Sequence, residues 1–146
     1  MIFDRTELFS DRQAVTATAA STNIIDTGAT GTVYGAAAAL TRDLGKGSQI
    51  PLAIRVVQSF NNLTSLTVAY QVSVDAAFAS PKTVVTSPAY TLAQVQSGAQ
   101  HILPDFVPVG ADFRYHRLLY TVAGTAPTLG QITAGYTAGN QTNNVL

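Results

Sequence analysis

The side chains that could take part in chemistry are few in this chain and form no recognisable catalytic or metal-binding pattern. Its two histidines, His101 and His116, match none of the spacings His-x-His, His-x-x-x-His or Glu-x-x-His. We therefore expect structural or surface roles for both histidines rather than metal binding. There is no cysteine, which excludes disulfides, thiolate metal sites and cysteine nucleophiles.

The carboxylates and glycine-rich segments do not indicate an active site either. The eight acidic residues fall mostly in expected loops or at strand ends, where Asp caps turns through its own backbone. No Gly-x-Ser-x-Gly elbow is present, and residues 28–31 and 45–48 lack the spacing and the following helix of a phosphate-binding loop. We predict that the chain is not an enzyme and binds no cofactor or metal.

Charge is scarce in this sequence. Eight basic and eight acidic residues give a net charge of zero, and charged residues make up 11% of the chain, against about 25% in an ordinary soluble domain. Proteins that remain dispersed usually keep their net charge away from zero. We infer that much of the surface meets other protein. Because the basic residues are scattered, we expect no nucleic-acid partner.

The length of 146 residues predicts one domain. We expect this domain to cover residues 14–139, after an N-terminal arm or first turn at residues 1–13 and before a flexible tail at residues 140–146. No segment reads as a secretory signal or approaches the ~20 apolar residues of a membrane span. We therefore expect synthesis in a cytoplasm and no membrane partner.

Apolar residues recur with the period of two that is typical of β-strands. The pattern predicts an all-β jelly roll or β-sandwich of about eight short antiparallel strands, with at most a short helical turn at residues 91–98. Asn61 and Asn62 favour a hairpin between the strands at 50–57 and 66–74. The other expected strands are 14–18, 22–26, 82–87, 100–104, 114–122 and 131–137.

The N-terminal residues are the first candidate contact surface. One interpretation is a terminal strand or turn that covers the chain's own core. The other is an arm that docks on a neighbour, with Phe3, Leu8 and Phe9 as apolar anchors and Arg5 and Arg12 as polar contacts.

The second candidate surface lies on the expected strand 114–122. His116 shares one face of this strand with large apolar residues, which fits a core position. Tyr115, Arg117 and Leu119 share the other face, which is too apolar for simple exposure to water. We expect Tyr115, Arg117 and Leu119 to lie in a subunit or capsid interface.

Several segments of the sequence resemble a known family. Residues 4–11 followed by 17–23, together with 45–47, 60–66 and 120–128, are similar to capsid cement proteins of tailed bacteriophages, the group typified by a Bordetella phage. These segments are specific jointly, and none of them is a chemical motif.

The resemblance implies a jelly-roll protein that self-associates as a homodimer or homotrimer. It would be assembled in the host cytoplasm and would sit on the outer surface of an icosahedral virion, bridging neighbouring major capsid proteins. The family implies no catalytic residue, cofactor or metal. An alternative is a carbohydrate- or receptor-binding β-sandwich, which would need exposed aromatic residues. The chain has no Trp and offers only Tyr34, Tyr90 and Tyr136 for that role.

Overall fold

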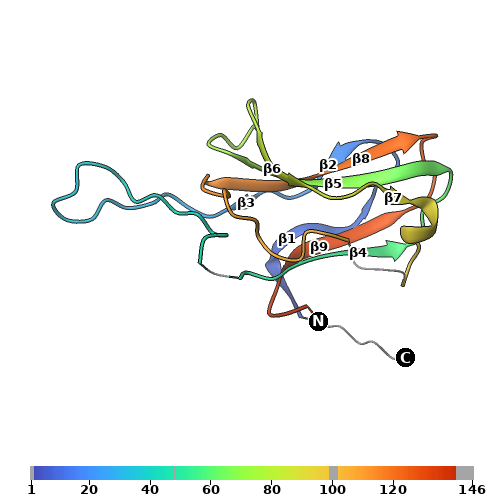
Figure 1. The fold of residues 1–146 in the computed structure, drawn as a ribbon, viewed down its shortest axis with the longest axis horizontal. Coiled ribbons are helices and arrows are strands. Elements are labelled where there is room, and N and C mark those ends of the chain that lie inside the picture. Colours follow the sequence, from blue (N-terminus) through green and yellow to red (C-terminus); the bar gives the residue numbers. More distant parts are fainter. Residues whose placement is uncertain (1, 48, 99–101, 141–146) are drawn as a thin grey trace.

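Two antiparallel β-sheets pack face to face in the computed structural model, which describes residues 2–47, 49–98 and 102–140 (Figure 1). The smaller sheet has the order β1-β9-β4, and the larger has the order β2-β8-β5-β6, with β3 also paired to β8 and β7 to β5. The prediction of an all-β sandwich is therefore confirmed. Its elements are β1 (Phe3–Ala14), β2 (Ala19–Ala20), β3 (Ile25–Asp26), β4 (Leu52–Gln58), β5 (Leu63–Ser73), β6 (Lys82–Thr86), β7 (Tyr90–Thr91), the 3-10 helix η1 (Leu92–Gln94), β8 (Tyr115–Gly124) and β9 (Gln131–Thr137).

The alternating segments of β5 and β8 supply the inner face of the larger sheet. These strands pair along their length, with Val68 opposite Tyr120 and Tyr70 opposite Leu118. Because strand side chains alternate between faces, every second residue points to the smaller sheet. The inward residues that are fully buried are Leu66, Val68, Tyr70, Val72, His116, Leu118 and Tyr120.

Tyrosine hydroxyls link the two sheets inside the sandwich. The hydroxyl oxygen of Tyr70 on β5 lies 2.7 Å from that of Tyr136 on β9. The Tyr120 hydroxyl on β8 is paired at 2.7 Å with Ser10 Oγ on β1, which itself donates to Gln13. Burial raises the pKa of all three tyrosines, so they remain neutral hydrogen-bonding groups.

Residues 50–57 and 66–74 do not form the predicted hairpin. β4 pairs with β9 in the smaller sheet, whereas β5 lies in the larger sheet. The connection therefore crosses between the layers, and it carries the buried side chain of Phe60. Gly130 is required here, because its φ is +140° and a Cβ would lie 2.3 Å from the Phe60 ring.

The N-terminal strand β1 differs from the two predictions made for this part of the chain, an arm or turn at residues 1–13 and a strand at residues 14–18. β1 takes in most of residues 1–13, and it ends at Ala14, so the predicted strand at 14–18 is wrong.

Of the predicted strand 100–104, residues 100 and 101 lie outside the described residues, and Ile102 forms a single bridge with Ile54. Of the predicted tail, residues 141–146 lie outside the description.

A 3-10 helix occupies the position of the predicted helical turn. The Gln94 side chain accepts a hydrogen bond from Thr91 N at 2.9 Å, which caps the start of η1. The turn is short, in agreement with the expectation of at most one or two helical turns.

His116 is buried on the inner face of β8. Its Nδ1 lies 2.9 Å from the Tyr70 hydroxyl oxygen, and its side chain is fully shielded from solvent. Burial lowers the pKa of His116 to about 4, against an opposing contribution from the Phe113 backbone. The folded protein therefore favours the neutral imidazole.

We expect the free energy of unfolding to fall as the pH drops from about 6.5 to about 4. In this range the unfolded chain binds a proton at His116 and the folded chain does not, so the stabilisation is complete above pH 6.5 and is lost toward pH 4. This one shift is worth about 3 kcal/mol. Urea unfolding at several pH values tests it, with His116→Phe showing a flatter dependence. Equal pH slopes in both proteins would contradict the assignment.

Candidate functional site

The structure places the five N-terminal interface candidates on β1. Phe9 is fully buried, and its ring packs edge-on to Tyr70 at 6.0 Å between centroids and to Tyr136 at 5.3 Å. Leu8 is also buried. These two side chains cover the chain's own core, so the prediction that they anchor an arm on a neighbour is wrong.

The irregular register of β1 explains why alternation did not reveal this strand. Pairing with β9 shifts between Leu8 and Ser10, so Leu8, Phe9 and Ser10 are all buried in succession. Phe3 is half-buried, and Arg5 and Arg12 are exposed. Phe3, Arg5 and Arg12 therefore remain available to a partner.

The outer face of β8 carries the other three candidates. Tyr115, Arg117 and Leu119 are each half-buried and share the face that points away from the core. β8 belongs to the larger sheet and β1 to the smaller one, so the six candidates outside the core form two separate surfaces.

A turn of the same chain covers part of this outer face. Phe78, in the turn after β5, is buried, and the Arg117 guanidinium lies 4.2 Å from its ring centroid. Arg117 Nε also donates to Gln71 Oε1 at 2.9 Å. These contacts account for some of the apolar character of the face, and Leu119 lies further along β8 from them.

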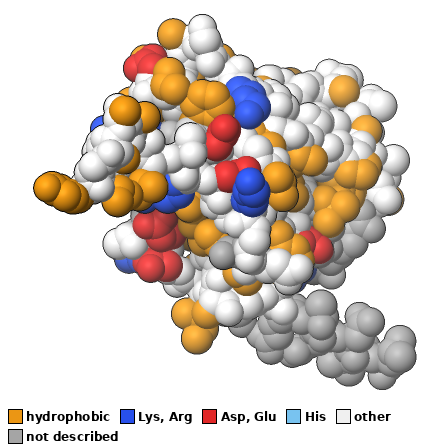
Figure 2. Space-filling model, turned by 60° about the vertical axis from the view of Figure 1, so that its left-hand side comes forward, with side chains coloured by type: hydrophobic (Ala, Val, Ile, Leu, Met, Phe, Trp, Pro, Cys, Tyr) orange, Lys and Arg blue, Asp and Glu red, His pale blue; other side chains and the backbone are white. Residues whose placement is uncertain are grey.

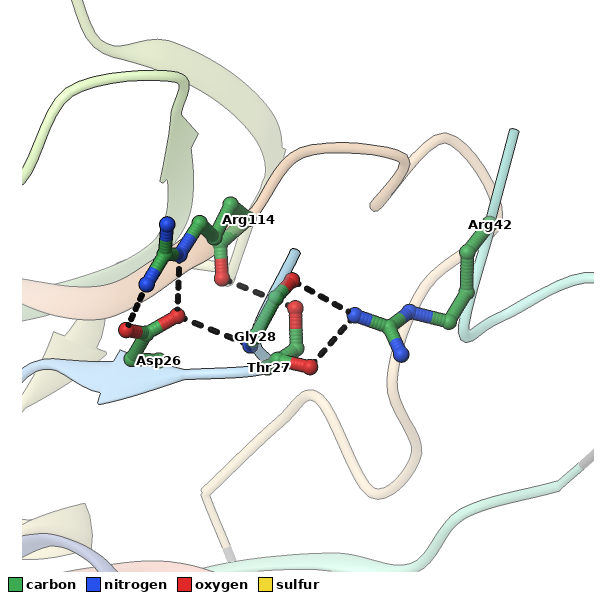
Figure 3. A network of polar contacts seen from close by, with 5 residues as sticks. All are labelled: Asp26, Thr27, Gly28, Arg42 and Arg114. Atoms are coloured by element: carbon green, nitrogen blue, oxygen red, sulfur yellow. Dashed lines mark hydrogen bonds and ion pairs between the residues drawn. The ribbon is translucent and has the colours of Figure 1, made fainter. Parts of the chain in front are cut away.

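A long loop joins β3 to β4, and its base is held by the polar network in Figure 3. Asp26 accepts two hydrogen bonds from Arg114, at 2.6 and 2.7 Å, and one from Gly28 N at 2.8 Å. Arg42, on the returning leg, donates to the carbonyl oxygens of Thr27 and Gly28. The Arg114 hydrogen bonds lower the pKa of Asp26 to about 2, so this carboxylate stays charged.

Beyond this base the chain extends away from the sandwich as the projecting loop, residues 28–42 (Figure 1). Leu40 N donates to Gly31 O at 3.0 Å, which joins the two legs. Ala36 N donates to Val33 O at 2.9 Å, and Gly35 has a φ of +81°, as the third residue of a type II turn requires. The tip therefore has a defined shape.

Apart from Arg42 at its base, the projecting loop is apolar and uncharged. Tyr34 is fully exposed, and Val33 and Leu40 are more than half exposed. Apolar side chains gather on the part of the molecule that protrudes at the left of Figure 2. Residues 27–41 contain no charged residue. Sequence reasoning missed this loop, although the long uncharged run without a strand period was a usable signal.

Of the three tyrosines considered for sugar binding, only Tyr34 is openly exposed. Tyr90 is buried, and its hydroxyl accepts a hydrogen bond from Leu103 N at 3.0 Å. Tyr136 is half-buried and bonded to Tyr70. The structure thus offers no cluster of these three rings, which weakens the carbohydrate-binding alternative.

The remaining chemical groups are dispersed over the described part of the chain. Within residues 2–47, 49–98 and 102–140, no three His, Asp or Glu side chains lie together as a metal site would require. His101 lies outside the described residues. In the same described part, no helix has the length and apolar character needed to cross a membrane.

Comparison with protein families gives a match along most of the chain. The model of the Bbp16 family, which is named for a Bordetella phage protein, matches residues 9–136. The chain belongs to the Bbp16 family. The match begins inside β1 and ends near the end of β9, so it includes both sheets and the projecting loop. No curated protein matches the chain.

Membership of the Bbp16 family confirms the resemblance to the Bordetella phage group. It ties this sandwich to phage proteins, and it assigns no role to an individual residue. The role of the two surfaces and of the projecting loop therefore depends on their own side-chain chemistry.

We predict that Phe9→Ala lowers the free energy of unfolding by about 3–5 kcal/mol, because it removes a fully buried ring from between the sheets. Ile2→Ala is the matched control in the same segment, since Ile2 is 75% exposed and should cost under about 0.5 kcal/mol. Chemical denaturation measures both values. A loss at Phe9 as small as that at Ile2 would show that β1 does not close the core.

Proposed function

We propose that this Bbp16-family chain is a structural virion protein that binds the outer surface of an icosahedral phage head. In this role it self-associates, as a homodimer or homotrimer, and cements neighbouring major capsid proteins. It works without catalysis, cofactor or metal, and its partners are the shell and other copies of itself.

The observation that carries the proposal is a low content of charged residues with no net charge on a phage-family sandwich. With charged residues at 11% and a net charge of zero, few ionic groups need to lose water when the surface is covered. The exposed apolar side chains lie mainly outside the two sheets, as at Tyr34, Val74, Val109 and Leu129. Such a surface suits contact with protein more than long residence in water.

A repeating shell allows such contacts to be individually modest. Each head presents many identical sites, and copies that also bind one another raise their effective concentration at the surface. The protein is then held on the head more tightly than any single contact would allow, without further contacts to the shell. A charge-poor protein gains little from electrostatic steering, so we expect its binding to depend weakly on salt.

Binding to heads is the direct test of this function. Purified protein mixed with undecorated heads of the cognate phage should co-sediment and saturate at a fixed number of copies per head. The saturation should persist between low and moderate salt. Absence of binding under every salt condition would reject the proposed function.

The exposed part of the β8 outer face gives a prediction about self-association. Leu119→Asp places a carboxylate on the proposed interface, and we expect it to weaken the oligomer at least about tenfold. Thr125→Asp, in the exposed loop after β8, is the control and should leave the oligomer unchanged. Sedimentation velocity over a dilution series measures both. A stable, unchanged Leu119→Asp oligomer would place the interface elsewhere.

A further inference from the structure

The projecting loop is built as a preorganised binding element. Its base is fixed by Asp26, Arg114 and Arg42, and its tip is fixed by backbone hydrogen bonds and the turn at Gly35. A segment that is already ordered loses less conformational entropy when it binds. The side chain at its end is Tyr34, a residue type that is enriched among the strongest contributors to protein interfaces.

The same chain carries a groove of complementary chemistry. This groove has a volume of about 510 Å³ and lies where the start of β1 passes the end of β9. Its residues are Ile2, Asp4, Glu7, Tyr136, Thr137 and Ala138. Ile2 is 75% exposed and gives the groove an apolar wall.

Two carboxylates stand in this mainly apolar groove. Glu7 is half-buried, and burial together with the nearby charge of Asp4 raises its pKa. A carboxylate in this position is stabilised by an incoming hydroxyl donor. A tyrosine could pack its ring against the apolar surface of the groove and donate a hydrogen bond from its hydroxyl to Glu7.

The loop cannot fill the groove of its own chain. Figure 1 shows the loop extending beyond one end of the sandwich, away from the start of β1 and the end of β9, where the groove lies. A contact between the loop tip and the groove therefore has to join two different copies.

The geometry points to a docking contact between two copies of this chain, in which Val33 and Tyr34 of one copy enter the groove of the other. The Tyr34 hydroxyl donates a hydrogen bond to the Glu7 carboxylate of that copy. The contact can be exchanged in both directions between two copies, or continued from copy to copy along a surface. It rests on the self-association in the proposed function and does not depend on head binding.

Site-directed cross-linking tests the contact, since the chain has no cysteine of its own. Val33→Cys protein is mixed with Ala138→Cys protein and treated with a short bis-maleimide. We expect a cross-linked dimer at several times the yield obtained when Thr125→Cys replaces Ala138→Cys. Adding Tyr34→Ser to the Val33→Cys chain should reduce the yield about tenfold, because it removes the docking side chain.

The contrary outcomes are distinct from failure of the proposed function. A yield no higher than with Thr125→Cys, in a protein that self-associates, would overturn the docking contact and leave the cementing role standing. Loss of head binding by Tyr34→Ser without cross-linking would assign the loop to the shell instead. If the thiol introduced by Ala138→Cys reacts only after truncation behind Asn140, the groove belongs to the chain's own C-terminal residues and the contact is overturned.

Discussion

The packing of tyrosines between the two sheets is the constraint on which the rest of the structure depends. Tyr70 and Tyr120 reach from the larger sheet to Tyr136 and Ser10 on the smaller one, and Phe9 fills the space beside Tyr70 and Tyr136. Buried hydroxyls are costly without partners, so these pairs also fix how the layers face each other. β1 is thereby committed to the core, and Phe3–Ala14 form a strand of the smaller sheet instead of a free arm.

With the core closed in this way, the loops and the outer faces of the sheets are left for the proposed contacts with other protein. Six of the sixteen charged residues gather around the base of the projecting loop, where they form hydrogen bonds and ion pairs. They are Asp26, Arg42, Asp43, Lys82, Asp112 and Arg114. Exposed pairs of this kind add little stability, but they orient what they hold. Residues 28–41 of the loop beyond them carry no charge, and Arg117 is the one charged residue on the outer face of β8.

Alternation predicted the strands β4, β5, β8 and β9, because each has one face on the core over several residues. It did not reveal which strands pair. β4 and β5 read as a hairpin, but both have a core-facing side in a sandwich whichever sheet they join. β1 was not predicted by alternation because its bulged pairing with β9 buries three residues in a row. A charged segment such as β1 therefore reads as surface when its bulges are unknown.

The candidate surfaces were predictable only in part. The outer face of β8 was correctly located from its alternation, but the cover supplied by Phe78 and Arg117 depends on a turn far along the chain. The projecting loop carries no periodic signal, and its shape comes from Gly35 and the Arg42 contacts rather than from burial. Sequence patterns report burial well, and they report exposed, hydrogen-bonded loops poorly.

We infer that a sandwich with so few charges is built to lie against other copies of itself and a larger shell. Light scattering on the purified chain over a wide concentration range tests this most directly. We expect a particle mass of two or three times 15.3 kDa, with dissociation only on strong dilution. A constant mass of 15.3 kDa at every concentration would contradict it.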